Sequence, residues 1–305
     1  MAEPRERPPA PPAPVLLLGV CAVATGALFV RLSDEAPPLV QATWRLTLAT
    51  LVILPWVGRS GLSTIVALPR REHLCLVGAG LALALHFLTW ISSLSHTSIA
   101  SSLLLVNTVP LWAGLMTPLF TRDRVSRRTW QAIAIAMLGA LVIGVGDLDV
   151  SASALGGDCL AVTGAILAAV YLLLGRRVRP LLTIASYLVA CYGVASLFLL
   201  GACAVSGQHL FGWSAATYGS LVALALVPQL LGHSAYNWSL RYLPAASVSV
   251  TLLGESVIGI LLAWLVLRES PPSSALVGGL VVLAGILRLV IGGRAEANGA
   301  APEPE

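Results

Sequence analysis

The sequence predicts an all-α polytopic membrane protein with ten transmembrane helices, arranged as two inverted five-helix repeats. The chain of 305 residues is 57% hydrophobic and 10% charged, with a mean hydropathy of +0.87, whereas about 25% of residues are charged in an ordinary soluble protein. No Asp, Glu, Lys or Arg occurs from His73 to Thr121 or from Pro180 to Leu240. In addition, the two halves of the chain resemble each other when one is shifted by 146 residues.

Ten apolar windows, each close to the roughly 20 residues that a bilayer crossing needs, are separated by clusters of Arg, Pro or Gly. They must be helices, because lipid offers no partner for backbone N–H and C=O groups. The first half contributes the windows 15–31, 38–57, 73–94, 99–120 and 129–146. The second half contributes the windows 155–174, 183–205, 215–238, 244–267 and 273–292.

These windows define the expected domain organisation. Residues 15–146 form the first five-helix repeat, 147–154 a linker and 155–292 the second repeat. The Pro-rich segment 1–14 and the tail 293–305 can bury almost nothing, so both are expected to be disordered.

The short loops predict an orientation, because an excess of Arg marks the cytoplasmic side of a membrane protein. Placing the N-terminus inside puts nearly all loop arginines in the cytoplasm and leaves only Arg31 and Arg268 outside. The outer side instead receives four acidic residues, Asp34, Glu35, Asp147 and Asp149. We therefore expect a multi-pass protein of the cell (plasma or inner) membrane with both termini cytoplasmic.

The internal match is sparse but ordered. A shift of 146 residues lays Ala100-Ser101 over Ala246-Ser247, Arg122-Asp123 over Arg268-Glu269, and Gly139 over Gly285. Five spans is an odd number, so the two copies would have opposite topology in the membrane, as in inverted-repeat transport proteins.

Several classes of partner are not expected. All 18 basic residues are Arg, which we interpret as codon bias, so the net charge of +4 requires no nucleic acid. The five cysteines form no CxxC pair and no Cys/His set at zinc spacing, so no metal is expected. We expect the lipid bilayer and a small molecule as partners, and no cofactor.

Two charged residues within the apolar windows are candidates for a binding site, because an ionisable group at mid-span costs about 2.5 to 3.5 kcal/mol and usually faces a partner or a cavity. Glu255, beside Gly254, could exchange a proton or bind a substrate ammonium group; alternatively it is a structural hydrogen-bonding residue. Arg45 could bind a substrate carboxylate or pair with Glu255; alternatively its long side chain extends to the headgroups.

Aromatic and polar residues add further cavity candidates. His86 and Trp90 lie four residues apart on one helix face, and Tyr236 corresponds to Trp90 under the 146-residue shift. Gln229 and His233 lie four apart in the eighth window. The alternative for such aromatic residues is ordinary packing or an interfacial belt.

Helix breaks are expected at Pro110, Pro228 and Gly254, because proline lacks the N–H that would bond back four residues. Asn107, one turn before Pro110, could line such a break or hydrogen-bond between helices. Asp158 is interpreted as a helix N-cap.

The segment YNWSLRYLPAASV (residues 236–248), followed by Glu255-Ser256 and Leu267-Arg268-Glu269, resembles the ninth-helix region of the EamA-type transporters of the drug/metabolite transporter superfamily. In that family a proline commonly follows the glutamate, and here Ser256 replaces it. The first half shows the complement, because residues 107–110 (NTVP) keep the proline and have Val109 where the glutamate would be.

Residues 41–45 (QATWR) in the second window and Gly157-Asp158 in the sixth extend the resemblance to nearly the whole chain from Val15 to Gly292. The resemblance implies ten helices in two inverted repeats around a substrate cavity. It also implies alternating-access transport, mostly outward, of amino acids, other metabolites or toxic compounds without ATP; no Walker A sequence is present.

Alternatives to a carrier are a membrane-embedded enzyme and a channel-like protein. The enzyme would need a catalytic set such as HExxH or GxSxG, and neither motif occurs in the sequence. A channel would show no saturable exchange. The sequence leaves a homodimer open.

Overall fold

The computed structural model describes residues 8–145, 151–268, 270 and 274–299, and every regular element among them is helical. The first half of the chain forms α1 (Pro12–Ala24), α2 (Gly26–Arg31), α3 (Pro38–Ile53) with a short 3-10 turn (Leu54–Trp56), α4 (Gly58–Val66), α5 (Arg70–Ser93), α6 (Ile99–Val106), α7 (Val109–Phe120) and α8 (Arg127–Val145).

The second half is also built from long helices and helices divided into shorter parts. It forms α9 (Ala152–Val178) with a 3-10 turn (Arg179–Leu181), α10 (Ile184–Ser206), α11 (Ala215–Leu224), a π-helical segment (Ala225–His233), α12 (Ser234–Ser239), α13 (Ala245–Leu252), α14 (Gly254–Leu262), a second π-helical segment (Ala263–Leu267) and α15 (Ala275–Gly299).

Eight helical stretches of the described chain are long and apolar enough to cross a membrane. They coincide with eight of the ten predicted windows and confirm an all-α polytopic membrane protein. The two remaining windows fall in α8 and in α15, whose apolar part, Leu276–Leu289, is shorter than a full span. Residues 147–150 of the predicted linker 147–154 lie outside the described residues, and α9 begins earlier than expected, at Ala152.

One detail of the sequence interpretation was wrong. Asp158 does not cap a helix, because it lies inside α9; the cap is Ser151, whose Oγ accepts a hydrogen bond of 3.2 Å from the backbone N–H of Ala154. Residues 58–66, between the second and third predicted windows, form the short helix α4, with Leu62 and Val66 exposed on its surface.

The fourth and ninth spans are divided at equivalent points of the two halves. The first division falls at Asn107-Thr108, between α6 and α7, and the second at Leu253, between α13 and α14. Asn107 and Leu253 are 146 residues apart. Pro110, the second residue of α7, has no N–H to donate to Val106, which explains the first division.

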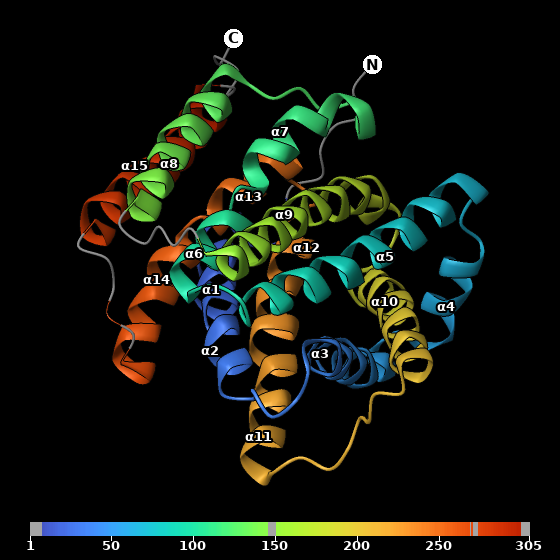
Figure 1. Cartoon of the computed structure of the whole chain (residues 1–305). Coiled ribbons are helices and arrows are strands. Elements are labelled where there is room, and N and C mark those ends of the chain that lie inside the picture. Colours follow the sequence, from blue (N-terminus) through green and yellow to red (C-terminus); the bar gives the residue numbers. More distant parts are fainter. Residues whose placement is uncertain (1–7, 146–150, 269, 271–273, 300–305) are drawn as a thin grey trace.

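The two halves are interleaved rather than side by side. Helix α5 packs along α9, α3 packs on α10, and α1 packs on the π-helical segment Ala225–His233. Figure 1 shows α8 and α15 lying next to each other at one edge of the molecule, apart from this central bundle. Their backbones are in close contact, since a Cβ added to Gly285 would lie 2.8 Å from the backbone N of Ala136. This arrangement leaves α1, α3, α5, α6, α7, α9, α12, α13 and α14, with the π-helical segment Ala225–His233, to surround the centre of the protein.

Candidate functional site

A small cavity lies at the centre of the bundle, with a volume of about 30 Å³. Except for α8 and α10, every span from α1 to α14 contributes to its wall, and both halves of the chain take part. The lining residues are Val23, Arg45, His86, Phe87, Trp90, Val106, Asn107, Val109, Ala168, Tyr171, Leu172, His233, Tyr236, Leu252 and Glu255.

Arg45 of α3 is fully buried and held at only one of its three guanidinium nitrogens. Its Nε donates a 2.8 Å hydrogen bond to Oε1 of Gln229, and its guanidinium carbon lies 3.8 Å from the centre of the Phe87 ring. Nη1 and Nη2 have no hydrogen-bond partner among the described residues. A buried cation without an ion pair is costly, so Nη1 and Nη2 are positioned to take a polar partner.

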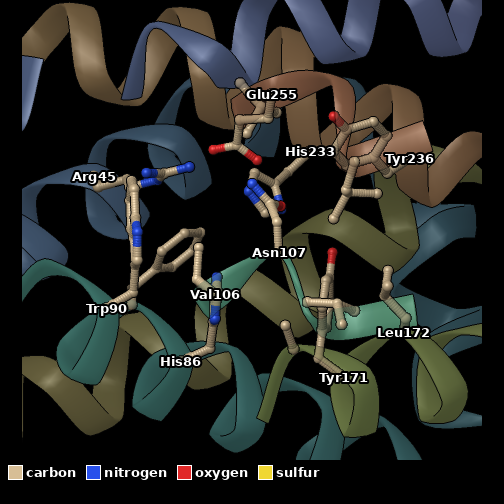
Figure 2. A pocket seen from close by; sticks show the side chains of 15 residues that line it. Arg45, His86, Trp90, Val106, Asn107, Tyr171, Leu172, His233, Tyr236 and Glu255 are labelled. Carbon is tan, nitrogen blue, oxygen red and sulfur yellow. The ribbon is translucent and has the colours of Figure 1, made fainter. Parts of the chain in front are cut away.

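Glu255, in the first turn of α14, brings the opposite charge to the same cavity. Its side chain is buried, and Figure 2 shows its carboxylate and the Arg45 guanidinium pointing toward each other across the cavity. The two groups form no ion pair or hydrogen bond in the described structure. The direct Arg45–Glu255 pair considered from the sequence is therefore absent here, and each charged group faces the cavity.

Two histidines lie between these charges and the opposite wall. Nδ1 of His86 lies 2.9 Å from the carbonyl oxygen of Gly164, which can only accept, so Nδ1 carries the proton and Nε2 is left as an acceptor. The His233 ring lies 6.5 Å from that of His86 and stands edge-on to Phe87 and Tyr236. The rings of His86 and Trp90, four residues apart on α5, are nearly parallel.

Several polar atoms around the cavity lack a partner within the part of the chain that the structure describes. Besides Nη1 and Nη2 of Arg45, they are Nε1 of Trp90, Nδ1 of His233 and the hydroxyl of Tyr236. Buried polar groups are normally hydrogen-bonded. Such a concentration of unpaired groups in one enclosed place indicates a binding site for a polar ligand.

Asn107 lines the cavity and also joins the two divided spans. Its Nδ2 donates a 2.9 Å hydrogen bond to Oγ of Ser256, and that hydroxyl donates to the carbonyl of Leu103. The serine that replaces the expected proline after Glu255 therefore fastens α14 to the end of α6.

Four of the predicted candidates lie outside the cavity wall. Gln229 does not line the cavity but accepts the hydrogen bond from Nε of Arg45. Pro228 directly precedes Gln229 in the π-helical segment. Pro110 lies in the first turn of α7, and Gly254 begins α14, where a Cβ would come 3.0 Å from Val20 of α1.

Sequence reasoning missed Tyr171 and Phe87. Tyr171 donates a 2.7 Å hydrogen bond to Oδ1 of Asn237, whose Nδ2 donates to Tyr192 and to the carbonyl of His233. This network fixes the floor of the cavity. A tyrosine and a phenylalanine in apolar windows carry no signal that separates a cavity wall from ordinary packing.

The polar groups are not spread evenly. In Figure 2, Arg45 and Trp90 lie at one end of the cavity and Leu172 and Tyr236 at the other, with Glu255 and His233 between them. Val23, Ala168 and Leu252 add further apolar wall. The cavity therefore has hydrogen-bond donors at one end, a carboxylate near its middle and apolar side chains at the other end.

Comparison with known proteins places this geometry in context. Residues 13–145 and 155–291 each match the model of the EamA-like transporter family. A probable terminal-alkyne amino-acid exporter from Streptantibioticus cattleyicolor is 29% identical over 269 residues, which cover 83% of this chain and 85% of that protein. A pseudopaline exporter from Pseudomonas aeruginosa is 24% identical over 279 residues, covering 90% and 95%.

A crystal structure of a protein with 17% sequence identity superposes with a TM-score of 0.73 and covers 93% of this chain and 98% of its own. At this identity the likeness concerns the fold alone.

Proposed function

The chain belongs to the EamA-like transporter family, and we propose that it is a secondary carrier that exports small zwitterionic metabolites of the amino-acid type by alternating access. Family membership makes it a transporter and not an enzyme. The observation that carries the substrate class is the pair of unbonded charges, Arg45 and Glu255, that face each other across one enclosed cavity.

An amino acid matches this pair of charges. Its carboxylate can accept two hydrogen bonds, one from Nη1 and one from Nη2 of Arg45. Both nitrogens are available because only Nε of Arg45 is bonded, to Gln229. Its ammonium group can donate to Glu255 and to the acceptor nitrogen of His86. An apolar side chain would then lie against Leu172 and Leu252.

The size of the cavity supports alternating access rather than a channel. A volume of about 30 Å³ holds one or two water molecules, since each needs about 10 to 15 Å³ on this measure. An amino acid enters such a site only when the surrounding helices separate.

The relatives support both the substrate class and the direction. The Streptantibioticus cattleyicolor protein is described as an amino-acid exporter and the Pseudomonas aeruginosa protein as a pseudopaline exporter. We extend export of small amino-acid-like molecules to this chain by analogy.

For the topology, we propose that α8 and α15 are the fifth and tenth of ten spans, in two inverted repeats with both termini cytoplasmic. The equivalent divisions at Asn107 and Leu253 support the repeat. The Arg-rich loops support the orientation. A homodimer stays a prediction.

The test is counterflow in proteoliposomes with labelled leucine, at an acidic and an alkaline pH. We expect saturable counterflow that is lost in Glu255→Gln and in Arg45→Lys, because a lysine cannot present two parallel donors to a carboxylate. The matched control is Glu72→Gln, which removes an acid that pairs with Arg177 far from the cavity.

Three competitors of similar shape separate the roles of the two charges. Leucine should inhibit at least about tenfold better than isocaproate, which lacks the amino group, or isopentylamine, which lacks the carboxylate. Flux that rises linearly with concentration would favour a channel. Absence of saturable flux for any amino acid in a wider panel would overturn the proposed substrate class.

A further inference from the structure

A second and larger cavity, of about 250 Å³, lies where α2 ends, α3 begins and α5 ends. None of its residues lines the central cavity. The residues around it are Val30, Arg31, Asp34, Ala36, Pro37, Pro38, Gln41, Leu94 and Ser95.

The second cavity lies one helical turn from the Arg45 site along three helices at once. Around the Arg45 guanidinium, a Cβ on Gly26 of α2 would lie 3.7 Å from Nη1 of Arg45 and 3.3 Å from the Trp90 ring of α5. Four residues along each helix from Gly26, Arg45 and Trp90 are Val30, Gln41 and Leu94, which all line the second cavity. A four-residue step is close to one turn, about 5.4 Å along the axis.

The layer of side chains next to the second cavity contains the Trp90 indole, which rests against Gly26, and the Arg45 guanidinium beside them. A side chain larger than hydrogen at position 26 would crowd the indole.

Gln41 presents an unsatisfied acceptor to the second cavity. Its Nε2 lies 2.7 Å from the carbonyl oxygen of Ser33, 2.9 Å from that of Ala36 and 3.3 Å from that of Val30. Three surrounding carbonyls fix the amide orientation, because only the NH₂ group can donate to them. Oε1 then has no partner among the described residues, although Gln41 is only 3% exposed.

The other polar groups of this wall carry both signs of charge. Asp34 and Ser95 add oxygen acceptors, and Arg31, which donates through Nη2 to the carbonyl of Thr97, adds a cation. A donor-rich cation such as a primary ammonium group suits Gln41 and Asp34, and a carboxylate on the same molecule is compatible with Arg31.

We propose that this cavity is a second substrate site, an outer vestibule that holds the zwitterion after it passes Trp90, with its ammonium group on Oε1 of Gln41 and the carboxylate of Asp34. The inference rests on the proposed carrier function, and it adds a binding site on only one side of the membrane. It assigns Trp90 and Gly26 to the layer that opens between the two sites.

The test compares half-saturation of leucine counterflow in right-side-out and inside-out membrane vesicles. When leucine is supplied on the face that carries Asp34, Asp34→Asn should raise the half-saturation concentration about threefold. This is the effect of losing a typical exposed ion pair. From the opposite face it should not change. Ser95→Trp, which fills the cavity, should lower the maximal rate of counterflow measured from either face.

The matched control is Glu35→Gln, which removes an acid one residue away that bonds to α11 instead of lining the cavity. Inhibition by isocaproate, which has no ammonium group, should be the same in wild type and Asp34→Asn. Intact leucine counterflow with unchanged half-saturation in Asp34→Asn, or an equal change from both faces, would overturn the vestibule alone. Absence of saturable flux of any amino acid in the wild type would overturn the carrier function and the vestibule together.

Discussion

Nε of Arg45 donates a 2.8 Å hydrogen bond to Oε1 of Gln229, a residue from the other half of the chain. Both side chains are fully buried. The neutral amide orients the guanidinium without cancelling its charge, so Nη1 and Nη2 stay available in the cavity. The π-helical segment Ala225–His233 brings Gln229 to this position, as wide turns often do at functional sites.

Gln229→Glu should raise the half-saturation for leucine counterflow about tenfold or more. The new carboxylate would form an ion pair with Arg45 and compete with the carboxylate of the substrate. The matched control is Gln131→Glu, since Gln131 also accepts a hydrogen bond from an arginine, Arg288, but at the exposed α8–α15 pair. Unchanged half-saturation in Gln229→Glu, with the protein intact, would show that Arg45 does not bind the substrate carboxylate.

The contact between α8 and α15 gives a prediction for stability. A Cβ on Gly285 would lie 2.7 Å from the Cβ of Ala136 and 2.8 Å from its backbone N. Gly285→Ala should therefore force the two helices apart and cost about 1 to 3 kcal/mol, as overpacking does. Thermal unfolding of the detergent-solubilised protein measures this loss.

Gly201→Ala is the control for this substitution, because a Cβ at position 201 of α10 would meet nothing within 4 Å. It should be neutral or stabilise by up to about 1 kcal/mol through helix propensity. Equal melting temperatures for the two variants would contradict the close approach of α8 and α15.

The span positions were predictable from the sequence because the bilayer imposes both length and apolarity. The short helix α4 was not, since nine residues with an exposed Leu62 and Val66 lack the length that identifies a span. Arg45 and Glu255 could be recognised as site candidates from the sequence, because a charge within an apolar span is costly to bury. Apolar wall residues such as Leu172 could not be recognised, because a residue that faces a cavity and one that faces lipid look alike in sequence.

The role of Gln229 shows a further limit. Counting 3.6 residues per turn assigns Gln229 and His233 to one helix face, and the sequence made both candidates for the cavity wall. The π-helical segment changes the spacing, so His233 lines the cavity while Gln229 contacts Arg45. Wide turns of this kind depend on tertiary packing around Pro228 and have no reliable sequence signal.

Arg176 joins three chain segments: α9, the connection from α7 to α8, and the connection from α12 to α13. Arg176 of α9 lies 2.8 Å from Asp123, in the connection from α7 to α8, and also donates to the carbonyls of Leu240 and Arg241. Both charged side chains are mostly buried, at 12% and 16% exposure.

Asp123→Asn should lower the free energy of unfolding by about 1 kcal/mol, a value between those of exposed and buried pairs. Glu72→Gln is the comparison, because its pair with Arg177 is longer, at 3.2 Å, and Arg177 is 26% exposed. We expect a loss below about 0.5 kcal/mol there. Thermal unfolding in detergent checks both, and a larger effect for Glu72→Gln would contradict the ranking.

At the opposite end, Glu35 connects the α2–α3 loop to the start of α11. Its Oε2 accepts hydrogen bonds from the backbone N–H of Ser214, at 3.0 Å, and from the hydroxyl of Thr217, at 2.8 Å. These hydrogen bonds hold the pKa of Glu35 below its ordinary value of 4.5, and the bond from the Ser214 backbone has the largest effect. The position at a helix N-terminus further suits a negative charge.

The direction of this shift predicts how acid affects the contact. Because the folded-state pKa is lower than the unfolded one, the ionised carboxylate stabilises the fold above about pH 4.5, and this contribution is lost as the pH falls through the folded pKa. Glu35→Gln should therefore melt at a lower temperature than wild type at neutral pH, and this difference should shrink as the pH falls below 4.5. Thr217→Val, which removes one of the two donors, should reduce the neutral-pH difference between Glu35 and Gln in a double-mutant cycle. A difference in melting temperature that persists unchanged in acid would mean that Glu35 acts through packing and not through its charge.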